Sequence, residues 1–316
     1  METTLITGGA GFIGSALTEM LLAQGQRVRI FDNFRRGQVE GKPFAGHAHL
    51  EVIRGDVLED LADLRGACQG VQRVIHCAAV AGIDTVIKSP TTTLRVNLLG
   101  TANALQAAHE AGGVQQFVNF STSEVFGTTV WGAVETDRSV LGSVGEARWS
   151  YAVGKVAGEH LAHAYWQEFR LPTVTVRPFN IYGPGQVGEG AIQIFVRQAL
   201  RGEDLVIHGE GNQIRAWCYI DDFIRGLDLI FHNPDAIGES FNLGNSRAVV
   251  TIYGLAEAII RITGSSSRIR FEPARSADVE LRVPRVDKAR RILGFEAQVD
   301  LEEGIRRTAD WVRDRL

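Results

Sequence analysis

The segment Thr7–Gly14, with the sequence TGGAGFIG, restricts the fold of this chain more than any other. It follows a short apolar run and precedes a stretch in which apolar residues recur at helical spacing. In this pattern Gly8 suits a tight turn, and Gly11 leaves room for a pyrophosphate at the helix N-terminus, where free N–H groups favour anions. Gly14 lets the helix pack closely on the strand. The order strand, glycines, helix predicts a dinucleotide-binding turn.

An acidic residue at the expected distance supports this prediction. Asp32 ends the next strand pattern, 18 positions beyond Gly14. A carboxylate there suits the two hydroxyls of a ribose and repels a 2′-phosphate, so it favours NAD over NADP. Arg35 and Arg36 follow closely and suit either a phosphate or a solvated loop. Asp56, after the third strand, suits either a position near the adenine or a helix N-cap.

The order of apolar runs indicates the fold class. Strand-like runs at 4–7, 27–31, 50–53, 73–76, 116–121 and 173–177 alternate with helical patterns, which include 92–111 and 151–169. Repeated strand–helix–strand order implies right-handed crossovers and a parallel sheet. We therefore expect an α/β fold with a Rossmann-type doubly wound sheet. After Pro178 the pattern becomes less regular and predicts a smaller C-terminal α/β substrate lobe.

The expected domains follow from this change of pattern. The NAD-binding domain covers residues 1–178 plus about 217–250, and the substrate lobe covers about 179–216 and 251–316.

Composition excludes several other classes of protein. The formal net charge of −4 argues against a nucleic-acid partner. No run of 18 apolar residues predicts a membrane span, and the start METTLITGG lacks the features of a signal peptide. The cysteines Cys68, Cys77 and Cys218 are too widely spaced for a metal or redox motif, so we expect no metal and a cytoplasmic protein with packing thiols.

A second motif carries the chemistry. Tyr151 and Lys155 are four residues apart on a predicted helix, so they lie on one face. A nearby ammonium lowers the pKa of a phenol from its free value of about 10. The phenolate can then take a proton from a sugar hydroxyl while hydride leaves the same carbon.

Together these segments resemble the extended short-chain dehydrogenases/reductases of the NAD-dependent epimerase/dehydratase family, which act on nucleotide sugars. The resemblance covers essentially the whole chain. It rests on the glycine turn and Asp32, and on HCAA at 76–79, NLLGT at 97–101, STSEVFG at 121–127, YAVGK at 151–155 and RPFNIYGPG at 177–185.

The resemblance implies tightly held NAD and a set of binding residues. The implied cofactor-binding residues are Gly8, Gly11, Phe12, Ile13, Gly14, Asp32, Asn33, Asp56, Val57, Ala78, Asn97, Tyr151 and Lys155. The implied substrate-binding residues are Thr122, Asn180, Gln193, Arg215 and Arg275. A UDP-sugar is the implied substrate. A homodimer through the helices at about 95–111 and 151–169 is implied as well.

The tripeptide Thr122-Ser123-Glu124 bears on the reaction. Family members first oxidise the sugar C4, and Thr122 matches the hydroxyl residue beside the catalytic Tyr. The 4,6-dehydratases resemble Thr-Asp-Glu here, so Ser123 argues against dehydration. Simple 4-epimerases usually lack the Glu, so Glu124 argues mildly against them. The Ser-Glu pair resembles the UDP-glucuronic acid decarboxylases, as does Arg148-Trp149 before the catalytic Tyr.

We therefore expect decarboxylation of UDP-glucuronic acid to a UDP-4-keto-pentose or UDP-xylose, with Tyr151, Lys155, Thr122, Ser123 and Glu124 as catalytic residues. A UDP-sugar 4-epimerase, acting on a hexose or hexuronic acid, is the alternative enzyme. A non-catalytic NAD(H)-sensing regulator is the alternative outside catalysis.

Overall fold

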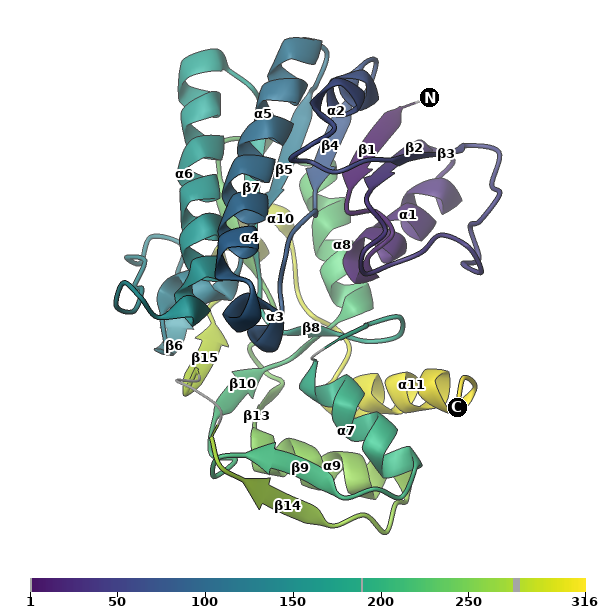
Figure 1. The fold of residues 1–316 in the computed structure, drawn as a ribbon, viewed down its shortest axis with the longest axis vertical. Coiled ribbons are helices and arrows are strands. Elements are labelled where there is room, and N and C mark those ends of the chain that lie inside the picture. Colours follow the sequence, from purple (N-terminus) through teal and green to yellow (C-terminus); the bar gives the residue numbers. More distant parts are fainter. Residues whose placement is uncertain (1, 189, 275–278) are drawn as a thin grey trace. The chain divides into compact units, whose positions relative to one another are not determined.

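A computed structural model describes residues 2–188, 190–274 and 279–316 (Figure 1). The chain divides into two compact units. The first contains residues 1–125, 141–177 and 228–241, and the second contains 126–140, 178–227 and 242–316.

The first unit is built on a seven-stranded sheet with the order β12-β7-β5-β4-β1-β2-β3. The strands are β1 (Thr3–Thr7), β2 (Arg27–Asp32), β3 (Leu50–Arg54), β4 (Arg73–His76), β5 (Gln116–Phe120), β7 (Thr173–Pro178) and β12 (Ser240–Leu243). The pairs that join β3 through to β7 are all parallel. From β1 the chain adds β2 and β3 on one side of the sheet and then β4, β5 and β7 on the other, so the direction of strand addition reverses between β1 and β4. In such sheets ligands bind outside the carboxyl ends of the strands at this reversal point. The Rossmann-type fold predicted from the sequence is confirmed.

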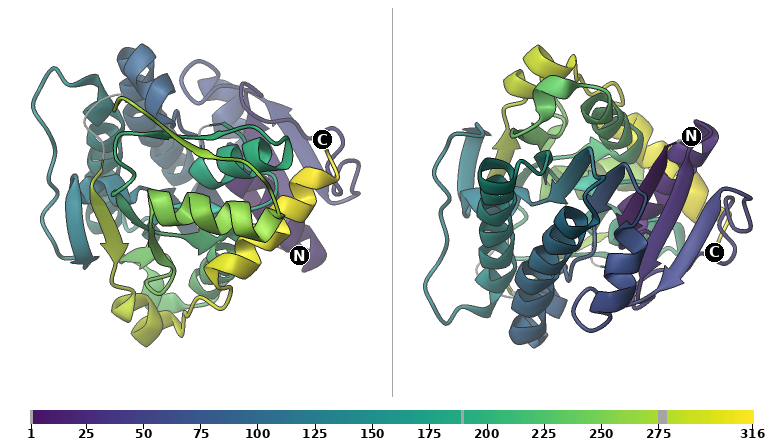
Figure 2. Two further views of the ribbon diagram at one scale, coloured as in Figure 1. Left: turned by 90° about the horizontal axis from the view of Figure 1, so that it is seen from below. Right: turned by 90° about the horizontal axis from the view of Figure 1, so that it is seen from above.

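Helices cover the sheet because its strands are apolar on both faces. The helices of this unit are α1 (Phe12–Ala23), α2 (Leu61–Cys68), α3 (Ile83–Lys88), α4 (Pro90–Leu94), α5 (Gly100–Ala111) and α6 (Ser150–Phe169). The neighbours α2, α5 and α6 lie along one face (Figures 1 and 2). They bury a core that includes Leu5, Val74, Leu105, Phe117 and Ala162.

One helical region departs from the regular α-helix that the sequence predicts over 92–111. Between α4 and α5 lies a π-helical turn, η1 (Arg95–Leu99), in which the N–H of Gly100 bonds to the carbonyl of Arg95. Such single π-turns often occur at functional sites. The helix then ends at Ala111, and Gly112 takes a left-handed conformation with φ 69°. The predicted end of this helical pattern at residue 111 is therefore confirmed.

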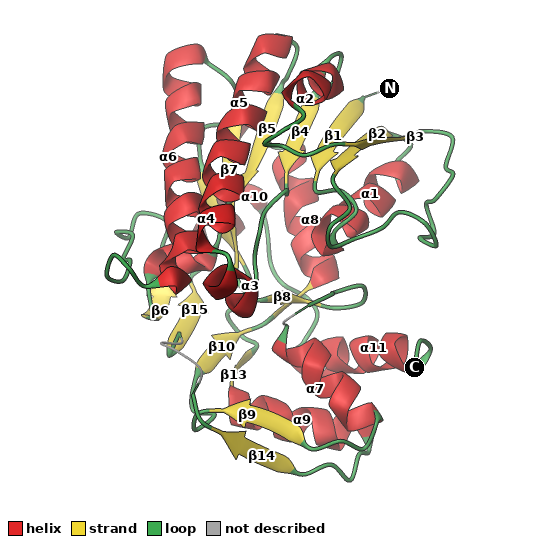
Figure 3. Ribbon diagram, viewed as in Figure 1, coloured by secondary structure: helices red, strands yellow, loops and turns green. Residues whose placement is uncertain are grey.

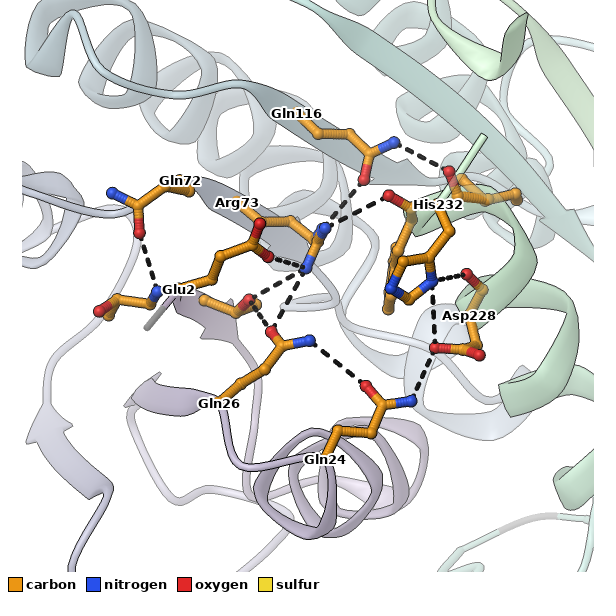
Figure 4. Close-up of polar contacts among 12 residues, drawn as sticks. Glu2, Gln24, Gln26, Gln72, Arg73, Gln116, Asp228 and His232 are labelled. Carbon is orange, nitrogen blue, oxygen red and sulfur yellow. Dashed lines mark hydrogen bonds and ion pairs between the residues drawn. The ribbon is translucent and has the colours of Figure 1, made fainter. Parts of the chain in front are cut away.

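A polar cluster anchors the amino-terminal edge of the sheet (Figure 4). Arg73, the first residue of β4, is buried and donates to Gln116 Oε1 at 3.0 Å and to the carbonyl of Phe231 at 3.3 Å. Its guanidinium also lies over the Phe231 ring, 4.6 Å from the centroid, and 3.6 Å from a carboxylate oxygen of Glu2. Phe231 ends α8 (Ile220–Phe231), so Arg73 ties the end of this helix to three strands.

The second unit is a smaller α/β body (Figure 3). Its four-stranded sheet has the order β13-β10-β15-β6, and two further two-stranded sheets pair β11 with β8 and β14 with β9. The strands are β6 (Thr129–Ala133), β8 (Ile181–Tyr182), β9 (Leu205–His208), β10 (Ile214–Ala216), β11 (Cys218–Tyr219), β13 (Val249–Thr251), β14 (Ile269–Glu272) and β15 (Leu281–Pro284). The helices α7 (Ala191–Leu200), α9 (Ile252–Thr263) and α11 (Leu301–Arg313) contact one another, and α10 (Asp287–Leu293) follows β15.

Across the described residues, no helix combines the length and apolarity needed to cross a membrane.

Candidate active site

The glycine turn has the close backbone contacts that a dinucleotide cradle requires. Gly8 has φ +73°, and a Cβ there would lie 2.7 Å from the backbone nitrogen of Ala78. A Cβ on Gly14 would lie 2.4 Å from the carbonyl oxygen of Gly8. Gly11 is the N-cap of α1, without a side-chain cap, and Phe12 and Ile13 form the first turn of the helix. The free N–H groups of this turn fit a pyrophosphate, so the residues present suit the dinucleotide predicted from the sequence.

Asp32 lies at the carboxyl end of β2, beside the glycine turn. One of its carboxylate oxygens accepts the N–H of Ala10 at 3.0 Å, and the other accepts the N–H of Phe34 at 2.8 Å. Burial raises the pKa of Asp32, while these two backbone hydrogen bonds lower it. Each carboxylate oxygen has a second lone pair, so the side chain is held in place and still able to accept from a ribose hydroxyl.

The residues expected near the adenine form a small polar group. Asn33 donates to Asp56 at 2.8 Å, and Asp56 also accepts the N–H of Leu58. The helix α2 starts later and has Asp60 as its N-cap, so Asp56 does not cap it. Val57 is buried, and its carbonyl accepts from Asn103 in α5. The roles of Asn33, Asp56 and Val57 toward a cofactor stay predictions.

Lys155 connects α6 to the sheet by a hydrogen bond. It is buried on α6 and donates to the carbonyl of Phe120, the last residue of β5, at 2.7 Å. Burial lowers its pKa to about 8, and the neighbouring Cys77 and Glu159 act in the opposite direction. Tyr151 lies four residues earlier on the same helix and is half-buried. The expected helical spacing of Tyr151 and Lys155 is therefore present.

The tripeptide Thr122-Ser123-Glu124 directly follows this anchoring point. Thr122 and Ser123 are buried, and Glu124 is half-buried. The hydroxyl of Thr122 accepts the backbone N–H of Glu124 at 3.2 Å, at the start of the short 3₁₀-helix η2 (Ser123–Phe126). The Lys155 ammonium therefore binds the backbone at Phe120, which precedes the tripeptide by two positions in the sequence. The tripeptide and α6 supply two hydroxyls, a carboxylate, a phenol and an ammonium, which are groups that can transfer protons.

Ala78 and Asn97 lie beside the carboxyl ends of the central strands. Asn97, in the π-helical turn, donates to the carbonyl of Val80 at 2.9 Å and accepts its N–H at 3.0 Å. The half-buried Cys77 has a raised pKa because of desolvation, so it stays a thiol and fits the packing role predicted for it. His76 was not predicted as a site residue, although it forms two buried hydrogen bonds at this edge. The sequence signal that could have identified it is a polar histidine at the end of an otherwise apolar strand, at 73–76.

The expected substrate residues that are described all belong to the second unit, except Thr122. Asn180 has φ 45° and donates to the carbonyl of Ala216 at 2.8 Å. Gln193, on α7, is buried, and neither end of its amide has a hydrogen-bond partner among the described residues. Arg215 is buried on β10. Arg275 lies outside the described residues. The substrate contacts of all four stay predictions.

Within the described ranges, no group of three or more His, Cys, Asp or Glu is arranged to hold a metal ion. A doubly wound sheet, a glycine turn with an acidic residue on the next strand, and a Tyr–Lys pair define a dinucleotide-dependent enzyme of the short-chain dehydrogenase/reductase type. The family described as the NAD dependent epimerase/dehydratase family matches residues 4–244. The chain belongs to this family, which confirms the resemblance and the NAD dependence inferred from the sequence.

Similar proteins cover nearly the whole chain. UDP-N-acetyl-alpha-D-glucosaminuronate decarboxylase from Bacillus cytotoxicus is 34% identical over 320 residues, which span 98% of this chain and 97% of that protein. UDP-glucuronic acid decarboxylase 1 from Xenopus tropicalis is 33% identical over 323 residues, 99% of this chain and 72% of that protein. Among solved structures, UDP-glucuronic acid 4-epimerase from Bacillus cereus, in complex with UDP-glucuronic acid and NAD, is 28% identical with a TM-score of 0.91 and covers 99% of this chain and 100% of that chain.

Proposed function

We propose that this protein oxidises C4 of a UDP-linked hexuronic acid and then decarboxylates it, with UDP-glucuronic acid as the substrate. The observation that carries the proposal is the hydrogen bond from Lys155 to the carbonyl of Phe120, because it holds the ammonium beside Thr122-Ser123-Glu124. Two similar proteins named as decarboxylases of UDP-linked uronic acids support this choice of substrate.

The proposed first step is oxidation at C4. Bound NAD supplies the acceptor for the hydride. The phenolate of Tyr151 takes the proton of the C4 hydroxyl as the hydride leaves C4, and the Lys155 ammonium stabilises that phenolate. Thr122 lies in the tripeptide next to the Lys155 anchor and acts as a hydroxyl relay in this transfer.

The proposed second step follows from the position of the new ketone. The C5 carboxylate is then part of a β-keto acid, so the bond from C5 to the carboxylate breaks, CO₂ leaves and its electron pair forms an enolate. Ser123 or Glu124, or a water that they hold, delivers a proton to C5. Arg215 binds the substrate carboxylate or stabilises the developing negative charge. The 4-keto-pentose is released, or it is reduced to UDP-xylose when the hydride removed in the first step returns to C4 and a proton is added to the oxygen.

The remaining expected residues complete the proposal. Asn180, Gln193 and Arg275 bind the nucleotide part of the substrate.

The helices η1, α5 and α6 form a homodimer contact, in which Leu99, Leu161 and Tyr165 take part. Leu99 is exposed, and Tyr165 and Leu161 are partly exposed. Sedimentation should give a mass equal to that of two chains. The variant Leu99→Glu should lower the measured mass toward that of a single chain. The three cysteines are free thiols, which suits a cytoplasmic protein.

The test supplies UDP-glucuronic acid labelled at the carboxyl carbon, together with NAD. We expect labelled CO₂ and a UDP-pentose. Tyr151→Phe should lower the rate by roughly 10²–10⁴, because it removes the proton acceptor. Glu124→Gln should slow CO₂ release, whereas Glu168→Gln, an exposed change near the end of α6, is the matched control.

Other outcomes of the same experiment separate the alternatives. Formation of UDP-galacturonic acid without CO₂ would establish a 4-epimerase, an activity carried by the similar Bacillus cereus enzyme. Tight NAD binding with no turnover of any UDP-sugar, and a cellular function unchanged by Tyr151→Phe, would establish an NAD(H)-sensing regulator.

A further inference from the structure

A network of hydrogen bonds, closed into a ring by the backbone between Ala78 and Val80, lies at the point where the strand order of the first unit reverses. Its two central members are Thr7, the last residue of β1, and His76, the last residue of β4, which are paired across the sheet. The Thr7 hydroxyl lies 2.8 Å from His76 Nδ1, and the Thr101 hydroxyl lies 3.1 Å from His76 Nε2. All three side chains are buried.

The directions of these bonds follow from one fixed donor. Thr101 donates its single hydroxyl proton to the carbonyl of Asn97 at 2.8 Å. It must therefore accept from His76, which carries its proton on Nε2. His76 Nδ1 is then an acceptor, so the Thr7 hydroxyl donates to it. The Thr7 oxygen keeps its lone pairs for the N–H of Ala78, at 3.4 Å.

The ring closes through the loop that follows β4. Asn97 holds Val80 by two hydrogen bonds, and Thr7 holds Ala78. The loop Cys77–Val80 is thereby fastened at both ends. The glycine turn rests on the same loop, because a Cβ on Gly8 would lie 2.8 Å from the Cα of Ala78. Any displacement of His76 would therefore reach the turn that holds the pyrophosphate.

The other side of the ring meets the catalytic helix. A Cβ on Gly154 would lie 3.0 Å from Asn97 Cβ, and a Cβ on Gly158 would lie 3.3 Å from a methyl carbon of Thr101. Two glycines four residues apart let α6 approach the ring directly, next to Lys155. Desolvation, and to a lesser extent the Lys155 ammonium, lower the pKa of His76 to about 3, so the imidazole stays neutral and Nδ1 stays an acceptor.

We propose that His76 is a positioning residue that joins the cofactor-binding turn at the end of β1 to the helical turn on which α6 packs. The proposal rests on the NAD dependence of the family and on the roles proposed for Tyr151 and Lys155. It assigns to His76 no contact with substrate or cofactor. Its effect passes through Thr7 on one side and Thr101 on the other.

The test measures the dissociation constant of NAD by calorimetry on cofactor-free protein, and also kcat and KM for UDP-glucuronic acid. Thr101→Val should weaken NAD binding by about tenfold, the effect of one lost hydrogen bond, although Thr101 lies on the far side of His76 from the glycine turn. Thr101→Ser keeps the hydroxyl and should restore binding to within about twofold. In a His76→Leu background, Thr101→Val should have no further effect, because the connection is already broken.

The matched control is Thr175→Val. Thr175 is a buried hydroxyl of the same sheet that accepts from Asn119 at 3.4 Å, outside the ring. The substitution Thr175→Val should lower the melting temperature and leave the NAD affinity unchanged. If Thr101→Val behaves like this control, or acts equally with and without His76, the proposal is wrong. If His76→Leu does not fold, the comparison of Thr101→Val with Thr101→Ser decides.

The failure of the proposed reaction gives a different result. Wild-type protein that binds NAD but releases no CO₂ would contradict the decarboxylase assignment, and the NAD affinities would still decide the role of His76. Wild-type protein that binds no NAD would overturn both.

Discussion

At the scale of single residues, the charge on Lys155 is strongly affected by its buried surroundings. An exposed lysine carries its ammonium without cost, but Lys155 is buried and donates to the carbonyl of Phe120. A carbonyl offers only partial compensation for lost water. The lysine is therefore held as a compact charge that is costly to keep, close to a phenol whose ionised form it would stabilise.

This cost predicts a pH-dependent stability of the cofactor-free protein. The pKa of Lys155 is about 8 in the folded chain against 10.5 as its ordinary value. Between these values the unfolded chain binds more protons, so the stability should rise with pH over this window. Relative to Lys155→Met, the wild type should gain up to about 3 kcal/mol from below pH 8 to above pH 10. Urea unfolding at both ends measures this, and parallel curves for the two proteins would contradict it.

At the scale of elements, α6 is joined to the sheet by a buried ion pair. Arg177, on β7, donates from Nε and Nη2 to the two carboxylate oxygens of Glu159, at 2.9 and 2.6 Å. Their side chains are only 8% and 11% exposed. Glu159 follows Lys155 by one helical turn, so this pair fixes the helix close to the catalytic residues. This bidentate arrangement of two parallel hydrogen bonds depends on the planar guanidinium of Arg177.

Breaking this pair from one side should be strongly destabilising. We expect Arg177→Met to lower the free energy of unfolding by about 3–5 kcal/mol, because the Glu159 carboxylate would stay buried with its cation removed. The double variant Arg177→Met/Glu159→Leu should recover part of this loss. Arg65 and Glu110 form an exposed pair, so Arg65→Met should cost less than about 1 kcal/mol. Equal losses for the two single variants, measured by urea unfolding, would show that burial of the pair does not matter.

The sequence predicted what depends on local pattern. The glycine turn, Asp32 and the Tyr151–Lys155 spacing are short-range features, and the structure has them in the expected elements. The π-helical turn was missed because helical periodicity does not reveal its long-range contacts, such as the hydrogen bond between Asn97 and Val80, 17 residues apart. The role of His76 was missed for the same reason, since both of its partners come from other elements.

At the scale of the whole molecule, the first unit is fastened at the two opposite ends of its central strands. The ring around His76 lies at the carboxyl end of β4, and Arg73 lies at its amino end. Arg73 contacts residues far apart in the chain, from Glu2 to Phe231. One end is proposed to serve the cofactor. The other holds a terminal segment, three strands and the end of α8 together.

Stability and activity should therefore separate in variants of Arg73. Arg73→Met leaves Gln116 Oε1 and the Phe231 carbonyl without their donor and should cost about 3 kcal/mol of unfolding free energy. The strand places Arg73 roughly 10 Å from His76, so NAD affinity well below the melting temperature should match that of the wild type. Arg27→Met, an exposed change on β2, is the control and should lie within about 0.5 kcal/mol. A weakened NAD affinity in Arg73→Met would show that the two ends are coupled.

The π-helical turn at Arg95–Leu99 has a consequence for length variation in this region. A π-helical turn contains one residue more than the corresponding α-helical turn. The extra residue rotates the side chains of the helix before the turn by about 100° relative to those after it. A one-codon deletion between positions 95 and 99 would straighten the helix and rotate Asn97 away from Val80. Such a deletion should release the loop after β4 and also turn the surface of α4 relative to that of α5, whereas a substitution at Asn97 removes only the two hydrogen bonds to Val80. Insertions and deletions here should therefore be tolerated far less than changes of residue type.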